Sequence, residues 1–265
     1  MAKVTRNTFF TSSLGDFSVY HMEGVEKLVI RAKGGPTKEQ IKNDPQFDRT
    51  RKNSSEFSGA GIASGKIMHT SHLINKAADN SFSGRLSAVC HVLQTLDTSH
   101  VHGERSILFT KNGQLLEGMN FSKLRIIDSV LKNLPAFVIS RDACSASVTF
   151  TDLFPGVNLF NPWNLPKYRL LITLGVLQDL VFTSSGYAAA NPEIILYRTQ
   201  VVTDWQSSND VFKSAIFKLR LADNAILDSN SSLVLSIGVE FGNRVTNLIT
   251  QPVKKACCGK IVGVR

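Results

Sequence analysis

The feature that most constrains the fold of this chain is an alternation of apolar and polar residues near its C-terminus. Over residues 233–241 an aliphatic or aromatic side chain occupies every second position, and Ser236, Gly238 and Glu240 lie between them. Successive side chains of a β-strand point to opposite faces of its sheet, so a period of two predicts a strand with one buried face. This segment therefore predicts a sheet that is covered on one side.

Similar segments recur through the second half of the chain. Turn-forming pairs such as Asn161-Pro162 and Gly242-Asn243 separate strand candidates at residues 169–174, 193–202, 217–221 and 260–264. Six or more short antiparallel strands at this spacing predict a β-sandwich over residues 106–265. At the start of that region, the Asn112-Gly113 pair predicts the turn of a hairpin over residues 106–116.

Residues 1–32 are expected to form a strand-like arm. Phe17 and Val19 alternate with polar residues, and residues 27–31 form a second short run. A strand pair of this size cannot bury enough apolar surface to be stable alone. The arm is therefore expected to be part of a small sheet or to lie against another surface.

Residues 33–105 are expected to be a helical segment with three closely spaced helix starts. Thr37 and Gln40 fit a capping box, in which each side chain accepts a hydrogen bond from the other residue's backbone amide. Asp44 precedes a proline and is expected to cap a second short helix, because a residue before proline is kept out of the α region. Asn53 is expected to open a third helix, and apolar spacing predicts another over residues 85–95.

The third helix has an unusual concentration of small residues, with glycine, alanine or serine at positions 59–61 and 63–65. Each glycine inside a helix costs about 0.5–1 kcal/mol relative to alanine, so this composition requires a compensating contact. Gly61 and Gly65 are four residues apart and share one helix face, where another helix or backbone could approach closely. Whether that neighbour belongs to the same chain or to another subunit stays open.

These segments together predict an α+β fold. It consists of an N-terminal arm (1–32) and a short-helix segment (33–105), followed by an antiparallel β-sandwich (106–265).

Part of the helical segment resembles a known sequence signature. Residues 33–57 read KGGPTKEQIKNDPQFDRTRKNSSEF. This stretch is similar to the signature of a family of uncharacterised proteins common in Bacteroidetes, in which KGGP[ST]KEQI is followed by DPxF, RTRxN, EF and a run of small residues. The resemblance implies a bacterial protein with helices followed by β-structure. It implies no catalytic residues.

Several chemical motifs are incomplete. Residues 60–67 resemble a phosphate-binding P-loop only in part, because Ala60 and Ile67 stand where that loop needs glycine and a hydroxyl residue. His69, His72 and His91 could converge on a metal ion, but no carboxylate completes the set. Cys144 lies among strand-like residues and is interpreted as a small apolar residue rather than a nucleophile. The sequence therefore predicts no catalytic residue, no metal site and no cofactor.

The net charge of +9 raises the question of an anionic partner. The densest basic group is Arg49, Arg51 and Lys52. It could contact phosphate groups or carboxylates on a neighbouring subunit, and a solvated helix face is an equal alternative. Because no long Lys/Arg run occurs, nucleic acid is a partner that the sequence allows but does not favour.

The remaining sequence features concern the cellular compartment. The four cysteines form no C-x-x-C pair, which is typical of a reduced compartment. The N-terminus has no apolar stretch long enough for a signal peptide, and no run of apolar residues is long enough to span a membrane. These features predict a cytoplasmic protein, or part of an assembly that is exported without a classical signal peptide.

The sequence is best interpreted as a non-enzymatic structural or assembly subunit that forms a homo-oligomer or polymer. The expected interface includes Arg49, Arg51, Lys52, Gly61 and Gly65. The alternative is a binding module that takes nucleic acid through the basic N-terminal half, or a glycan or other ligand on the sandwich.

Overall fold

The computed structural model of the protein describes residues 2–4, 13–22, 27–194, 197–222, 225, 227–246 and 248–265. They form two compact units, Met1–Arg51 and Lys52–Arg265. The sequence predicted boundaries after residues 32 and 105. The structure instead groups the helices after residue 52 with the sheets, because the two share one apolar core.

The first unit contains a small antiparallel sheet and two short helices. The strands are β1 (Ala2–Val4), β2 (Ser13–Leu14), β3 (Phe17–Tyr20) and β4 (Leu28–Ala32), in the order β1-β4-β3-β2. After it come α1 (Lys38–Asn43) and the 3-10 helix η1 (Pro45–Phe47). The predicted capping box of Thr37 and Gln40 is confirmed, and the Asp44 side chain caps η1 by accepting from the Gln46 amide.

Helix α2 (Asp48–Thr70) is longer than the sequence predicted. The expected helix start at Asn53 is wrong, because η1 leads into α2 through Asp48, which is already in the α conformation. The side chains that suggested a cap make tertiary contacts instead. Ser55 donates to the Gly103 carbonyl at 2.7 Å, and Glu56 is fully buried.

The second unit contains two sheets that face each other as a β-sandwich. A five-stranded sheet has the order β10-β7-β13-β14, with β11 also paired to β7, and a three-stranded sheet has the order β12-β6-β5. All of these pairs are antiparallel. The bounds are β5 (Ala136–Ser140), β6 (Ser145–Phe150), β7 (Lys167–Gln178), β10 (Arg198–Val202), β11 (Gln206–Ser207), β12 (Ala215–Arg220), β13 (Ser231–Arg244) and β14 (Thr250–Val264).

The predicted strands agree with these elements in most places. The candidates at 169–174, 233–241 and 260–264 fall within β7, β13 and β14, and β12 covers most of 217–221. The last residues of the candidate at 193–202 form β10, whereas 195 and 196 lie outside the described residues.

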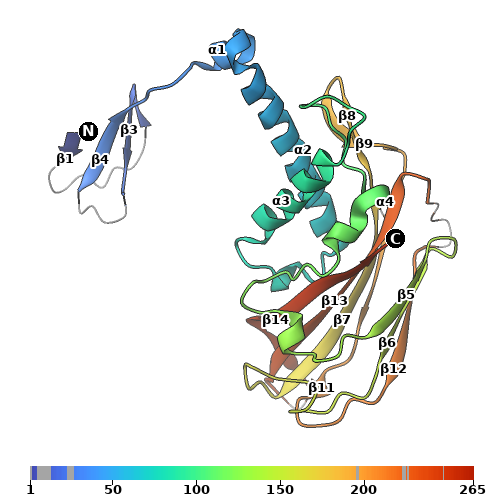
Figure 1. The fold of residues 1–265 in the computed structure, drawn as a ribbon. Helices are drawn as coiled ribbons and strands as arrows, with labels where there is room; N and C mark the ends of the chain where they lie inside the picture. Colours follow the sequence, from blue (N-terminus) through green and yellow to red (C-terminus); the bar gives the residue numbers. More distant parts are fainter. Residues whose placement is uncertain are drawn as a thin grey trace. The chain divides into compact units, whose positions relative to one another are not determined.

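The five-stranded sheet is covered on both faces (Figure 1). One face packs on the three-stranded sheet through a core that includes Val148, Ile172 and Ile237. The other face packs on α2, α3 (Phe82–Thr95), α4 (Phe109–Asn112) and the 3-10 helices η2 (Asn75–Ala77) and η3 (Gly113–Leu116). The alternation at 233–241 predicted one buried face, but β13 is buried on both sides along residues 231–242.

The contact between the sheet and the helical layer explains the small residues of β13 and β14. Ile74 lies directly above the sheet, and a Cβ atom at Gly259 would come within 2.1 Å of its Cγ2. The Ser71 and Ser236 hydroxyls are 2.8 Å apart and hydrogen bond to each other in this contact. The polar half of the alternation therefore faces a second layer of protein rather than solvent.

The predicted hairpin over residues 106–116 is wrong. Residues 109–116 form α4 and η3, and Gly113 has a φ of −59°, which differs from the positive φ of the expected turn. The Asp179 side chain caps this helix from a distant strand connection, since it accepts from the Thr110 amide at 2.9 Å and the Thr110 hydroxyl at 2.6 Å. A local turn signal was overridden by this long-range cap and by burial of Phe109.

The last strand pair of the second unit is β8 (Leu180–Thr183) with β9 (Gly186–Ala189), and η4 (Ile127–Ser129) precedes β5. Tyr187 of β9 lies against α2, where it becomes part of the polar network described below.

Candidate functional site

The three basic residues that were predicted to lie in an interface have different surroundings in the structure. The Arg51 guanidinium donates to the carbonyls of Ile41 and Asp44 at 2.7 and 2.9 Å, which ties α2 to the short helices before it. Lys52 is half-buried, and its Cγ would lie 2.7 Å from a Cβ at Gly103. Arg49 is exposed and makes no hydrogen bond or ion pair with any described residue. Of the three, Arg49 is the side chain best placed to meet a partner.

The small residues of α2 occupy two different faces. Gly59 packs against Tyr187, and a Cβ at this position would come within 2.8 Å of the aromatic ring. Gly61 and Gly65 are exposed, and a Cβ at either position would meet nothing within 4 Å. The close approach predicted for Gly61 and Gly65 is therefore not made by the described part of this chain, whereas Gly59 makes such a contact.

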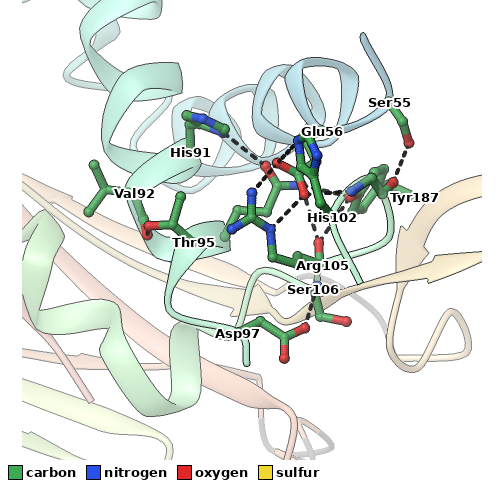
Figure 2. A network of polar contacts seen from close by, with 12 residues as sticks. Ser55, Glu56, His91, Val92, Thr95, Asp97, His102, Arg105, Ser106 and Tyr187 are labelled. Carbon is green, nitrogen blue, oxygen red and sulfur yellow. Dashed lines mark hydrogen bonds and ion pairs between the residues drawn. The ribbon is translucent and has the colours of Figure 1, made fainter. Parts of the chain in front are cut away.

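A buried ion pair fixes α2 to the loop after α3 (Figure 2). Glu56 accepts two hydrogen bonds from Arg105, from Nε at 2.7 Å and from Nη2 at 2.6 Å, and a third from the Gly103 amide at 2.9 Å. Burial by itself raises the pKa of Glu56, but the Arg105 and Gly103 contacts outweigh it, and the pKa lies below its usual value. The lowered pKa and the three hydrogen bonds both favour the ionised form of this carboxylate, which is the form that a structural ion pair requires.

The same network extends to β9. The Tyr187 hydroxyl donates to the Arg105 carbonyl at 2.9 Å, and the Gln94 amide donates to the Tyr187 oxygen at 2.8 Å. Asp97 accepts from the Ser99 and Ser106 amides, which closes the loop between α3 and α4. Together these contacts hold α2 and α3 in a fixed geometry from their buried sides, since buried and fully satisfied networks rigidify their surroundings.

The outer face of α2 and α3, opposite this network, carries an exposed apolar group next to a hollow. Phe57 directly follows Glu56 and is 75% exposed. It lines a hollow of about 500 Å³ together with Asn53, Ser54 and His91. An aromatic side chain exposed to this extent on a rigid helix pair is typical of a contact surface.

The N-terminal sheet carries a second apolar surface. The register pairs Phe17 with Ala32 and Val19 with Ile30, so all four residues lie on one face. Phe17 is 49% exposed, Ala32 is exposed, and Val19 and Ile30 are only half-buried. The opposite face carries Ser18 and Arg31 together with Tyr20 and Val29, and Val29 is buried. In the described part of this sheet, the face with Phe17 is therefore apolar and incompletely covered, whereas the opposite face mixes polar and apolar residues.

The other candidate residues lie apart from these surfaces. His69 is exposed in the last turn of α2, and His91 is near Gln94 in α3. The described residues contain no group of three or more metal-ligating side chains. Cys144 is half-buried in the turn between β5 and β6, with a φ of 45° and its thiol near the Arg141 carbonyl.

Sequence reasoning missed the Glu56–Arg105 network. A signal for it was present, because Glu56, Ala60, Ala63 and Ile67 recur at helical spacing and form the buried face of α2. A carboxylate on such a face requires a cation, but nothing in the sequence identified Arg105 as its partner.

Among the residues that the structure describes, no helix combines the length and the apolar character needed to cross a bilayer. No family model, curated protein or solved structure matches this chain.

Proposed function

We propose that this protein is a non-enzymatic structural subunit that associates with further copies of itself, and that the apolar face of the N-terminal sheet is the principal contact. The observation that carries this proposal is the alternation of Phe17 and Val19 on β3 against Ile30 and Ala32 on β4, with Phe17 half exposed. A sheet face of this composition gains free energy when a second apolar surface covers it.

The size of the sheet strengthens the proposal. Its strands are two to five residues long, and Leu28 and Val29 are the only buried hydrophobic residues among residues 15–22 and 27–51, the part of the first unit whose side-chain burial is described. A sheet this small needs packing against another element for stability. Association would supply that packing, at about 25 cal/mol for each Å² of apolar surface removed from water.

The outer face of α2 and α3 is proposed as a second contact. Phe57 would supply an aromatic anchor, and the open space over Gly61 and Gly65 would allow a partner backbone to approach closely. Arg49, at the start of the same helix, would donate charge-assisted hydrogen bonds to carboxylates of the neighbouring copy. Two different surfaces on one subunit are what a ring or a polymer needs, because head-to-tail contacts join unlike patches.

Light scattering on the full chain tests this proposal. The unaltered protein should have a mass above that of the monomer at tens of micromolar, and the double variant Phe17→Ser/Ile30→Ser should shift it toward the monomer. Ser18→Glu is the matched control, because Ser18 lies on the opposite face of β3 and should leave the mass unchanged. A monomeric unaltered protein, or an equal shift in the control, would contradict the proposal.

A further inference from the structure

The outward face of the three-stranded sheet has an uneven profile. Its register places Val138, Ser147 and Lys218 in one row across the sheet, and Ser140, Ser145 and Arg220 in the next. The central strand β6 therefore presents short hydroxyl side chains, while Val138 on β5 and Lys218 and Arg220 on β12 are longer. Val138 is 66% exposed on one side, and Lys218 is exposed on the other. The result is a trough that runs along β6.

This trough is a hollow of about 480 Å³. That volume is in the range of small-molecule sites, roughly 300–1,000 Å³. Its lining contains two cations, Lys218 and Arg220, and no carboxylate. Lys218 makes no ion pair with any residue that the structure describes, and the Ser145 and Ser147 hydroxyls have no hydrogen-bond partner within that part of the chain. The trough therefore offers a positive charge and hydroxyl groups that the protein itself leaves unused.

We propose that this trough binds a small organic anion of sugar size that carries a phosphate or sulfate ester. Lys218 pairs with the ester oxyanion. Ser145 and Ser147 hydrogen bond the hydroxyl groups of the ring, and Val138 packs on its apolar side. This site is independent of the self-association proposed above, because it lies on the outer sheet of the second unit.

The chemistry of the lining favours an anion over a neutral ligand. A lysine ammonium is a donor without acceptor capacity, and a hydrogen bond to a charged group is about twice as strong as one between neutral groups. Hydroxyl groups can donate and accept, so the serines suit a ligand with mixed hydrogen-bonding groups. An exposed cation is screened by salt, so binding should weaken as ionic strength rises.

Calorimetric titration of the full chain at low salt tests the proposal, with glucose 6-phosphate, glucose 6-sulfate, inorganic phosphate and glucose as separate probes. At least one sugar ester should bind more tightly than glucose and more tightly than inorganic phosphate. The comparison of the two esters identifies which oxyanion the site prefers. Lys218→Gln should weaken binding of the preferred ester by about tenfold or more, as expected when a charge-assisted hydrogen bond is lost.

Two matched controls define the site. Lys213→Gln removes another exposed lysine that is paired with Asp152 and does not line the trough, so binding should not change. Ser147→Val should fill the floor of the trough and weaken binding of the ester. Thr149→Val changes a residue of the same strand that does not line the trough, so it should leave binding unchanged. Lack of binding by both esters, equal binding of glucose, or equal losses in Lys218→Gln and Lys213→Gln would overturn the proposal. None of these outcomes bears on the mass measured by light scattering.

Discussion

The five-stranded sheet of the second unit and the four-stranded sheet of the first unit share an alternating pattern but differ in what covers them. In β13 of the second unit, the apolar positions face the sandwich core and the polar positions face the helical layer, and both sides are buried. In β3 and β4 of the first unit, Phe17, Val19, Ile30 and Ala32 lie on one face that is half exposed. The larger sheet is stabilised by its own chain, whereas the described part of the smaller one leaves apolar surface available.

This difference shows what an alternating pattern can and cannot establish. The pattern indicates which residues share a face, because the side-chain period of a strand is two. It does not indicate what lies opposite that face. We propose self-association through the smaller sheet because its apolar face is incompletely covered, whereas the larger sheet is buried on both faces along β13.

Arg105→Met should have the largest effect, and it should act on the second unit. It leaves the fully buried Glu56 carboxylate without its cation, and breaking a buried pair by removing one partner costs about 3–5 kcal/mol. The free energy of unfolding from urea titration measures this loss.

Replacing both partners, Glu56→Gln with Arg105→Met, is the control. It removes the unpaired charge and should recover part of the loss. A single Arg105→Met variant as stable as the unaltered protein would contradict the structural role assigned to the network.

A matched pair of isoleucine truncations compares the two sheets directly. Ile237 is fully buried in the sandwich core, so Ile237→Ala should cost about 2–5 kcal/mol of unfolding free energy. Ile30 is half-buried, and Ile30→Ala should cost less than about 1 kcal/mol in the unfolding of the second unit while it lowers the associated mass. Equal losses of stability from the two substitutions would remove the distinction between the sheets.

Much of the larger fold could be predicted from local sequence patterns. The capping box at Thr37, the cap at Asp44 and the strand at 233–241 depend on neighbouring residues, and all three are present. The hairpin at 106–116 and the helix start at Asn53 were wrong, because Asp179, Gly103 and Arg105 act on those segments from far along the chain. Long-range partners of this kind leave no local signal.

The candidate surfaces were predictable to a smaller extent. The sequence identified Gly61 and Gly65 as a small-residue face, and the structure leaves that face open. The sequence did not reveal that Gly59 differs from them by packing against the Tyr187 ring of β9. It also did not reveal that Arg51 hydrogen bonds to backbone carbonyls of its own chain. Both depend on tertiary contacts rather than on spacing.

Alanine substitutions at two glycines of α2 should have opposite effects on stability. Gly59→Ala forces the Tyr187 ring to move and should cost about 1–3 kcal/mol. Gly61→Ala meets nothing within 4 Å and should stabilise the helix by about 0.5–1 kcal/mol. Thermal unfolding of both variants measures the signs. If Gly61→Ala also lowers the associated mass, the open face of α2 is part of the contact.

Acid should weaken the second unit through Asp79, which links the connection before α3 to the Lys123 amide. Burial raises the pKa of Asp79, but hydrogen bonds from Lys123 and Ser81 and the charge of Arg85 lower it overall to about 2. Because the folded pKa is depressed, this stabilisation is complete above the ordinary pKa near 3.8 and is lost as the pH falls toward 2. The loss should be about 1–2 kcal/mol.

Unfolding titrations between pH 5 and pH 2 measure this effect, and Asp79→Asn is its control. The variant should be less stable at pH 5 and should show a smaller decline toward pH 2. An equal decline in the variant and in the unaltered protein would show that other carboxylates are responsible.

The most direct test of self-association is the particle mass of the full chain across a range of concentrations, compared with the chain lacking residues 1–32. We predict that the mass of the full chain rises with concentration above that of a monomer, and that removal of the N-terminal sheet abolishes or sharply reduces this rise. A full chain that stays monomeric at tens of micromolar, with a mass dependence unchanged by the deletion, would contradict the proposal.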